Sequence, residues 1–255
     1  MDTRPERIIL LKVPIDIVPP DELPEVIRGL LSMKRSVDSP EGGMDIVLLS
    51  LWDLLRARRN NEYRNYVLNA ALIIPISRSL VSGAKFLTKK KIFRHMPFKF
   101  VISLLTIMEK QEQSVYLLGG GSRILKKTEK NIRLTYPQLK IVGRFELPLR
   151  KKEEGAVIEA IRKSSPTLLL AGKGIRNKEL WIYRNSSRLN SGFRLWCSDL
   201  FNVFAEKKSR PSEIAFEKGL ECIGYCLRNP LKIFRIFPYF RYKLLLLFYK
   251  LFRKY

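Results

Sequence analysis

The stretch NAALIIPISRSL, residues 69–80, joins an apolar run to a proline and then turns polar. In open α/β sheets, ligand sites lie just beyond the carboxyl ends of the strands. The side chains that follow this run are Ile76, Ser77 and Arg78, with no carboxylate, histidine or cysteine among them. Ser77 can form hydrogen bonds and Arg78 can pair with a phosphate, so both are candidate substrate-binding residues. A surface arginine explains Arg78 equally well.

Two glycine turns after other apolar runs could hold a phosphate. VYLLGGGSRIL, residues 115–125, has the pattern of a strand, a turn and a helix start, whose backbone N–H groups can bind an anion. LLAGKGIRNKEL, residues 169–180, repeats this pattern. A tight strand-to-helix turn explains the glycines as well. The candidate binding residues in the two turns are Gly119, Gly120, Arg123, Gly174, Lys178 and Glu179.

These residues must be positioned by alternating strands and helices. Short apolar runs predict strands at residues 7–15, 44–50, 72–76, 114–120, 139–145, 167–172 and 193–199. Helical patterns lie at residues 21–33, 51–70, 98–111, 123–136, 153–164 and 176–188. Such alternation predicts an α/β fold with a Rossmann-like, largely parallel sheet and helices on both faces.

Composition narrows the class of partner. The 255 residues include 48 Lys and Arg against 24 Asp and Glu, a formal net charge of +24. Such a charge predicts attraction to phosphate-rich partners, among them nucleotides, anionic lipids and nucleic acid. We expect no nucleic-acid partner, because no recognisable reader motif is present. No signal stretch follows the amino terminus, which predicts that the chain is not exported by that route.

The three cysteines do not predict a metal site or a disulfide framework. Cys222 and Cys226 would share a helix face, but His95 is the only histidine and no ligand set completes a zinc site. Half-buried thiols in a reducing cytoplasm are the expected state. We therefore expect no metal or other cofactor.

Residues 228–255 differ from the rest of the chain. They contain eight basic residues, nine aromatic residues and no acid. On a helix the basic side chains cover about a third of the circumference and apolar side chains cover much of the rest. This pattern predicts a helix lying in the interface of an anionic membrane, too short to span it. Pro238 should divide the segment, and the basic aromatic stretch 85–100 could extend the same surface, although a solvated loop fits it too.

The order of several motifs adds a resemblance. They are VPID (13–16), NNEYRNYVLNAALIIP (60–75), Arg94 after KKK, VYLLGGG (115–121) with Asn131, YPQLKIVG (136–143), KELWIYRN (178–185), SRP (209–211), GLE (219–221), Tyr225 and NP (229–230). Over nearly the whole chain, this collinear order resembles the WecG/TagA/CpsF family of bacterial glycosyltransferases.

The resemblance implies a Rossmann-like core, residues 1–215, and a membrane-associating helical appendage, residues 216–255. It implies transfer of a sugar, typically N-acetylmannosamine, from a UDP donor to a lipid-diphosphate-linked acceptor. The expected place is the cytoplasmic face of the cell membrane, in cell-surface polysaccharide or glycolipid synthesis. Arg94, Arg123, Lys178 and cations of the appendage would offset the diphosphate charge in place of a metal.

The sequence departs from the family at the reaction centre. The family's strand ends in Pro-Asp-Gly, whose aspartate is the proposed base, whereas Ile76 stands at that position here. Loss of one general base costs about 10²- to 10⁴-fold in rate. Asp199 and Glu179 are candidate replacements, because both are expected at the carboxyl ends of strands. Alternatively, Asp199 caps a helix and Glu179 pairs with a neighbouring cation such as Lys178 or Arg176.

Two hypotheses stay open at this point. The first is a divergent, membrane-associated glycosyltransferase. The second is a catalytically inactive relative that binds a nucleotide sugar or a partner glycosyltransferase at the membrane. The sequence leaves the oligomeric state undetermined.

Overall fold

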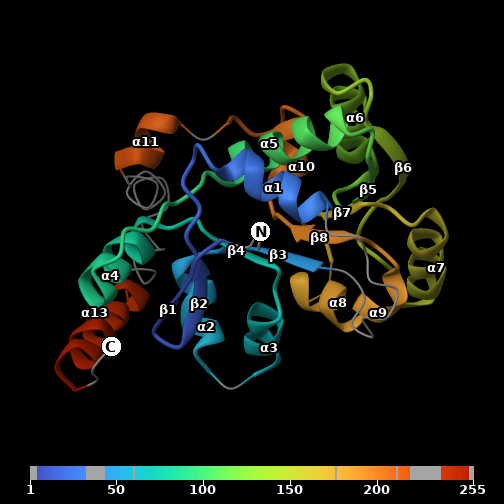
Figure 1. The fold of residues 1–255 in the computed structure, drawn as a ribbon. Helices are drawn as coiled ribbons and strands as arrows, with labels where there is room; N and C mark the ends of the chain where they lie inside the picture. The colour runs from blue at the N-terminus through green and yellow to red at the C-terminus, as the bar shows by residue number, and fades with distance from the viewer. Residues whose placement is uncertain are drawn as a thin grey trace.

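The computed structural model describes residues 5–32, 44–59, 61–175, 177–210, 212–218 and 237–252. Its centre is a six-stranded sheet in the order β4-β3-β8-β7-β5-β6, in which every neighbouring pair is parallel. The strands are β3 (Met44–Leu49), β4 (Leu72–Pro75), β5 (Ser114–Leu118), β6 (Lys140–Phe145), β7 (Leu168–Ala171) and β8 (Phe193–Trp196). The predicted α/β fold with a parallel sheet is confirmed (Figure 1).

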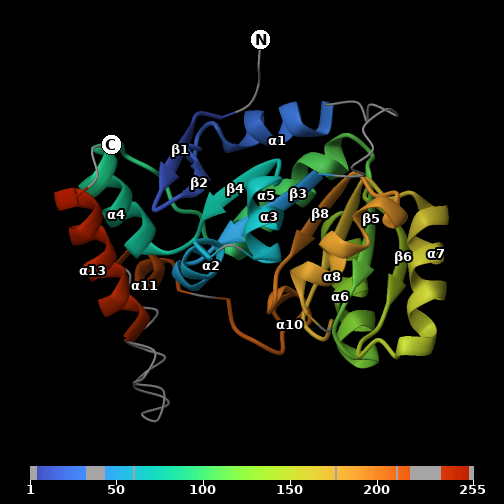
Figure 2. The same ribbon diagram turned by 90° about the horizontal axis from the view of Figure 1, so that it is seen from below.

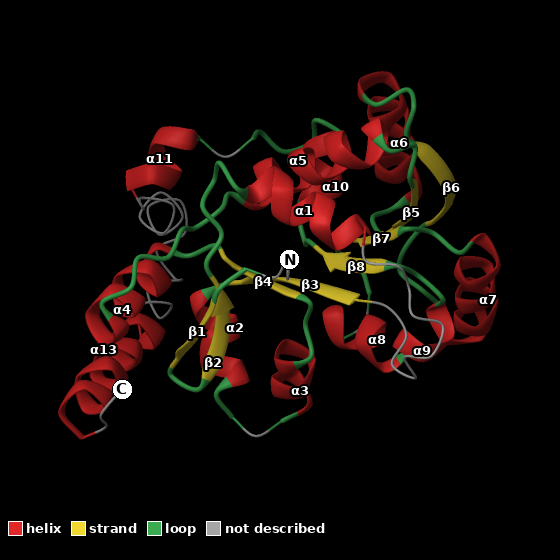
Figure 3. Ribbon diagram, in the orientation of Figure 1, coloured by secondary structure: helices red, strands yellow, loops and turns green. Residues whose placement is uncertain are grey.

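Helices cover both faces of the sheet, as Figure 3 shows. One face carries α1 (Leu23–Ser32), α5 (Pro97–Lys110), α6 (Ser122–Thr135) and α10 (Leu200–Phe204). The other carries α2 (Leu51–Ala57), α3 (Glu62–Leu68), α4 (Arg78–Thr88), η1 (Lys151–Glu153) with α7 (Glu154–Ser164), α8 (Glu179–Arg184) and α9 (Ser186–Leu189). Burial on both faces explains why the central strands are continuous apolar runs: Leu168 and Leu170 face one helix layer, and Leu169 faces the other.

The predicted first strand is instead an antiparallel hairpin, β1 (Arg7–Leu10) and β2 (Val13–Asp16), outside the main sheet. Its turn places Leu11 and Lys12 at φ 50° and 72°. Two-residue turns of this kind usually need glycine or asparagine, so the sequence carries no turn signal. Burial of Leu11 and the contacts of Asp16 stabilise the hairpin despite this turn. Asp16 forms an ion pair with Arg7 at 2.6 Å and accepts a hydrogen bond from the Ile73 N–H of β4 at 2.6 Å.

Two predicted helices are each broken in two. Residues 51–70 form α2 and α3, because Asn61 accepts the Arg64 N–H at 2.9 Å and starts a new helix. Residues 176–188 become α8 and α9, divided at Asn185. Helix α4, which follows β4 directly, has no counterpart among the helices predicted from the sequence.

The carboxy-terminal part includes α11 (Glu213–Lys218) and α13 (Phe237–Phe252). The predicted boundary at residue 215 falls inside α11, and the division into domains stays a prediction. Helix α13 packs along α4 and also contacts α2, at the opposite end of the sheet from α7 (Figure 2). Pro238 lies in its first turn, where a missing N–H costs no helical hydrogen bond. Residues 228–236 and 253–255 of the predicted tail lie outside the described residues.

Candidate active site

The carboxyl ends of β3 and β4 are neighbours, and a serine follows each of them and bonds at the start of α2. Ser50 follows β3 and caps α2: its Oγ accepts the Asp53 N–H at 3.3 Å, and Asp53 Oδ2 accepts the Ser50 N–H at 3.1 Å. Ser77 follows β4, and its Oγ accepts the Leu51 N–H at 3.2 Å. Ile76, at the position of the family's aspartate, is half-buried. The structure thus brings Ser77 to the start of α2, and its substrate-binding role stays a prediction.

Glu179 is the buried carboxylate of this edge of the sheet. It is the first residue of α8, its side chain is 7% exposed, and its Oε1 accepts a hydrogen bond from Arg56 Nη1 at 2.8 Å. The other oxygen, Oε2, is buried and accepts no hydrogen bond from any residue that the structure describes. The predicted pairing of Glu179 with a cation is therefore present, but the partner is Arg56 of α2 and not Lys178.

Burial sets the protonation behaviour of this carboxylate. Removal from water raises the pKa of Glu179 above its ordinary value, and the nearby negative charge of Asp53 adds to this effect. A hydrogen bond from the Glu179 backbone, and then the positive charges of Arg56 and Lys178, oppose the shift because they favour the ionised form. A carboxylate with a raised pKa is a stronger proton acceptor near neutral pH than a solvated glutamate. The site thus contains a group suited to general-base chemistry.

Aromatic and acidic side chains complete this cluster. The guanidinium of Arg56 lies 4.0 Å from the centre of the Tyr63 ring. Burial, with the charges of Asp53 and Glu179, raises the pKa of Tyr63 far above its usual range, so its hydroxyl stays neutral. Sequence reasoning missed Asp53, Arg56 and Tyr63. The available signal was the i, i+3 spacing of Asp53 and Arg56 on the helix that follows a predicted strand.

The segment between β7 and α8 leads into Glu179 and has an unusual backbone at several described residues. Gly174, Asn177 and Lys178 have φ values of 118°, 62° and 53°. Such conformations are uncommon outside glycine and concentrate at functional sites. The Lys178 ammonium lies 5.7 Å from the centre of the Trp196 ring, and Trp196 Nε1 is buried without an acceptor among the described residues. Trp196 ends β8, and Glu179 follows the neighbouring strand β7. This edge of the sheet thus contains a buried donor, Trp196 Nε1, and a buried acceptor, Glu179 Oε2, that have no hydrogen-bond partner among the described residues.

The two glycine turns are joined to each other. The Gly120 N–H donates to Lys173 O at 3.0 Å, and the Gly119 N–H donates to Phe145 O at 3.1 Å. A Cβ on Gly119 would lie 2.6 Å from the Phe201 ring and 2.9 Å from Gly172, so close packing requires glycine there. Backbone carbonyls thus occupy both N–H groups, which leaves the first N–H groups of α6, beside exposed Arg123, as the open part of this turn.

The remaining predicted cations flank the same edge. Arg94 belongs to a segment that reaches the end of β4, where the His95 N–H donates to Pro75 O at 3.0 Å. Its guanidinium lies 3.8 Å from the centre of the Phe216 ring, so α11 packs over it. Arg78 is exposed in the first turn of α4. The predicted contacts of these arginines with a substrate stay predictions.

Asp199 differs from Glu179 in its surroundings. It follows β8 at the start of α10, but its side chain makes no capping hydrogen bond. Instead it pairs with Lys208 at 2.7 Å, with 48% of the side chain exposed. Solvent screens such a pair, and Asp199 lacks the burial that removes Glu179 from water. No cluster of His, Cys, Asp and Glu suited to a metal ion is found among the described residues, and Cys222 and Cys226 lie outside them.

An open parallel sheet thus has a buried carboxylate, serine hydroxyls and several cations along its carboxyl edge, where ligand sites of α/β proteins lie. The chain belongs to the glycosyl transferase WecG/TagA/CpsF family, whose model matches residues 8–255. It is also similar to an N-acetylglucosaminyldiphosphoundecaprenol N-acetyl-beta-D-mannosaminyltransferase of Bacillus spizizenii, with 21% identity over 174 residues, 68% of this chain and 67% of that protein.

Proposed function

We propose that this protein transfers an N-acetylhexosamine-type sugar, such as N-acetylmannosamine, from a UDP donor to a lipid-diphosphate-linked acceptor at the cytoplasmic face of the cell membrane. Family membership and the activity named for the Bacillus relative support this class of donor and acceptor. Arg94, Arg123 and Lys178 supply positive charge along the carboxyl edge, which favours a diphosphate leaving group. No metal or other cofactor enters the proposal.

The observation that carries the catalytic part is the Glu179 carboxylate, buried, held by Arg56 and with one oxygen unused by the described residues. In the proposed step, an acceptor hydroxyl oxygen attacks the anomeric carbon of the sugar and the bond from that carbon to the UDP oxygen breaks. Glu179 takes the hydroxyl proton, and UDP leaves with the bonding electron pair. Because Glu179 is buried, the proposed step requires a rearrangement that exposes its Oε2 atom to the acceptor hydroxyl.

Helix α13 supports the membrane part of the proposal. Its apolar side chains Phe237, Phe240, Leu244, Leu247, Phe248, Leu251 and Phe252 are each between 51% and 75% exposed. Exposed apolar residues at this density mark a contact surface, and Arg241, Lys243 and Lys250 are exposed on the same helix. An anionic bilayer matches both features. No helix among the described residues is long and apolar enough to cross a membrane.

The test is product formation by the full chain on vesicles that contain phosphatidylglycerol and a lipid-diphosphate-linked N-acetylhexosamine. UDP-N-acetylmannosamine and other UDP-N-acetylhexosamines serve as donors, and UDP release and the lipid product are both measured. We expect sugar transfer with at least one donor. If UDP binds but no donor gives a product, the protein does not catalyse this transfer.

One observation favours a second candidate, a non-catalytic relative that binds a nucleotide sugar or a partner glycosyltransferase. Ile76 cannot accept a proton, and the neighbouring Ser77 hydroxyl is engaged with the Leu51 N–H. On this reading, the Arg56–Glu179 pair only ties α2 to α8. Tight UDP binding that is unchanged by Glu179→Gln, without turnover, would support it.

A further inference from the structure

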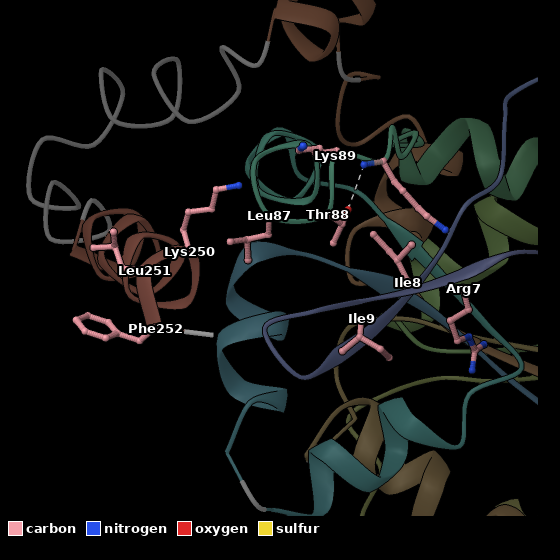
Figure 4. A pocket seen from close by; sticks show the side chains of 10 residues that line it. Arg7, Ile8, Ile9, Leu87, Thr88, Lys89, Lys250, Leu251 and Phe252 are labelled. Atoms are coloured by element: carbon pink, nitrogen blue, oxygen red, sulfur yellow. Dashed lines mark hydrogen bonds between the residues drawn. The ribbon is translucent and has the colours of Figure 1, made fainter. Parts of the chain in front are cut away.

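A cavity of about 820 Å³ lies away from the candidate active site, between β1, the end of α4 and the end of α13. Ile8 and Ile9 of β1 line it, and Figure 4 shows their side chains on opposite sides of the strand, with Leu87 and Lys89 at the end of α4 and Lys250 on α13. Its wall combines cations with large apolar side chains. This mixture differs from the polar lining expected of a site for a soluble anion.

The cations of this cavity divide into two kinds. Arg7 is paired with Asp16 at 2.6 Å, and Lys90 is paired with Glu6. Lys89 and Lys250 have no carboxylate within ion-pair distance among the described residues. Lys250 donates to Phe86 O at 3.3 Å, which holds its ammonium near the end of α4. Two positive charges are therefore available at the cavity for an anionic group.

The apolar part of the wall is open to the outside. Ile9 is 51% exposed, Leu251 75% and Phe252 72%. Leu251 and Phe252 also belong to the exposed face of α13, so the cavity is continuous with the surface proposed to contact the membrane. A free phosphate would leave these apolar groups in water, and a neutral lipid would leave the two lysines without a counter-charge. A single anionic amphiphile provides both a negative charge for the two lysines and an apolar part that covers the exposed apolar side chains.

We propose that this cavity binds one anionic phospholipid of the membrane. Its headgroup phosphate lies between Lys89 and Lys250, and its acyl chains lie along Ile9, Leu251 and Phe252. This is a saturable site, distinct from general adsorption of the basic helix to a charged surface. The proposal does not depend on sugar transfer.

Such a lipid would orient the protein on the membrane. Tyr242 Oη donates to Ser79 O at 3.0 Å, so the middle of α13 is fixed next to the carboxyl end of β4. Lys250 lies eight residues further along the same helix, about 12 Å at 1.5 Å per residue. A lipid held at Lys250 therefore fixes one end of α13 to the bilayer, while the Tyr242 contact keeps the middle of the helix beside the segment that follows β4.

The test is calorimetric titration of the full chain with dihexanoyl-phosphatidylglycerol below its micelle concentration. Dihexanoyl-phosphatidylcholine and inorganic phosphate are titrated separately. The double variant Lys89→Gln/Lys250→Gln removes both cavity lysines. Lys85→Gln/Lys243→Gln is the matched control, because it removes two exposed lysines from the same two helices outside the cavity.

We expect one phosphatidylglycerol per chain, binding roughly 25-fold weaker in the cavity variant if each lysine contributes about fivefold, and within about twofold of wild type in the control. Ile9→Glu, at a half-exposed position that tolerates a polar side chain, should weaken binding similarly, whereas Leu244→Glu should not. Equal binding of phosphatidylcholine or of inorganic phosphate, equal losses in the two double variants, or absence of saturation would overturn the proposal.

Discussion

Arg56 Nη1 donates to Glu179 Oε1 at 2.8 Å, a contact between residues 123 positions apart that links α2 to the start of α8. The two partners differ in exposure, 41% for the Arg56 side chain against 7% for Glu179. The carboxylate is therefore the desolvated member, and Arg56 can be hydrated when its partner is lost. Because the two partners differ in exposure, substitution of Arg56 and substitution of Glu179 should have different effects, and each can be measured separately.

Removal of Arg56 should shift the pH dependence of sugar transfer. The positive charge of Arg56 lowers the pKa of Glu179, against burial. In Arg56→Gln the pKa should rise further, and the acid limb of the kcat/KM profile should move to higher pH. Arg56→Lys keeps the charge and should leave that limb close to wild type. A uniform fall in rate without movement of the limb would mean that Arg56 acts only in the fold.

Glu179→Gln should change stability in a pH-dependent way. The folded pKa of Glu179 is raised from 4.5 by burial, so the native state binds more protons than the unfolded state just above pH 4.5. The contribution of Glu179 to the free energy of unfolding is thus fully present below pH 4.5. It is lost as the pH rises through the raised pKa of the folded state. Urea unfolding across this range should give a stability difference that increasingly favours the glutamine variant. A constant difference would mean that the pKa is not shifted.

The exposed face of α13 should control vesicle binding. Leu247→Glu/Phe248→Glu places two charges where apolar groups would enter the bilayer, and both positions are 51% exposed, so the fold is unaffected. We expect at least about tenfold weaker binding to phosphatidylglycerol vesicles in a sedimentation assay, since each buried side chain of this size contributes about 1.5–3 kcal/mol. Leu68→Glu, 41% exposed on α3, is the control and should bind normally.

Gly83→Ala should destabilise the contact of α4 with α13. Alanine normally favours a helix by about 1 kcal/mol over glycine. Here a Cβ would overlap Tyr242 Oη and lie 2.8 Å from Tyr242 Cζ, so we expect a net loss of roughly 1–3 kcal/mol. Faster proteolysis near residue 242 should accompany the fall in thermal midpoint. Ser82→Ala, on the exposed side of α4, should match wild type in both assays.

Much of the sheet was predictable because its strands are buried on both faces. Val115 to Leu118 and Leu168 to Leu170 are continuous apolar runs, and the sheet contains them as β5 and β7. The hairpin turn at Leu11 was not predictable, because tertiary burial, and not turn chemistry, holds its left-handed backbone.

The candidate site was predictable only in part. Glu179 was foreseen because it follows a glycine turn at a strand end. Arg56 was not foreseen, because its role depends on how α2 packs beside α8, and that packing has no local sequence signal. In the sequence, Asp199 and Glu179 both follow a predicted strand, so the pattern does not separate them. The structure does, because Asp199 forms an exposed ion pair with Lys208 whereas Glu179 is buried.

The most direct measurement is single-turnover sugar transfer by Glu179→Gln, with the protein in excess over the lipid-linked acceptor and donor binding measured in parallel. Glu62→Gln removes another ion-paired glutamate, bound to Arg184 at 2.5 Å, and serves as the matched control. We predict a loss of about 10²- to 10⁴-fold in the transfer rate, with UDP-sugar affinity retained and the control within about twofold of wild type. A Glu179→Gln rate equal to wild type would contradict the assignment of Glu179 as the base.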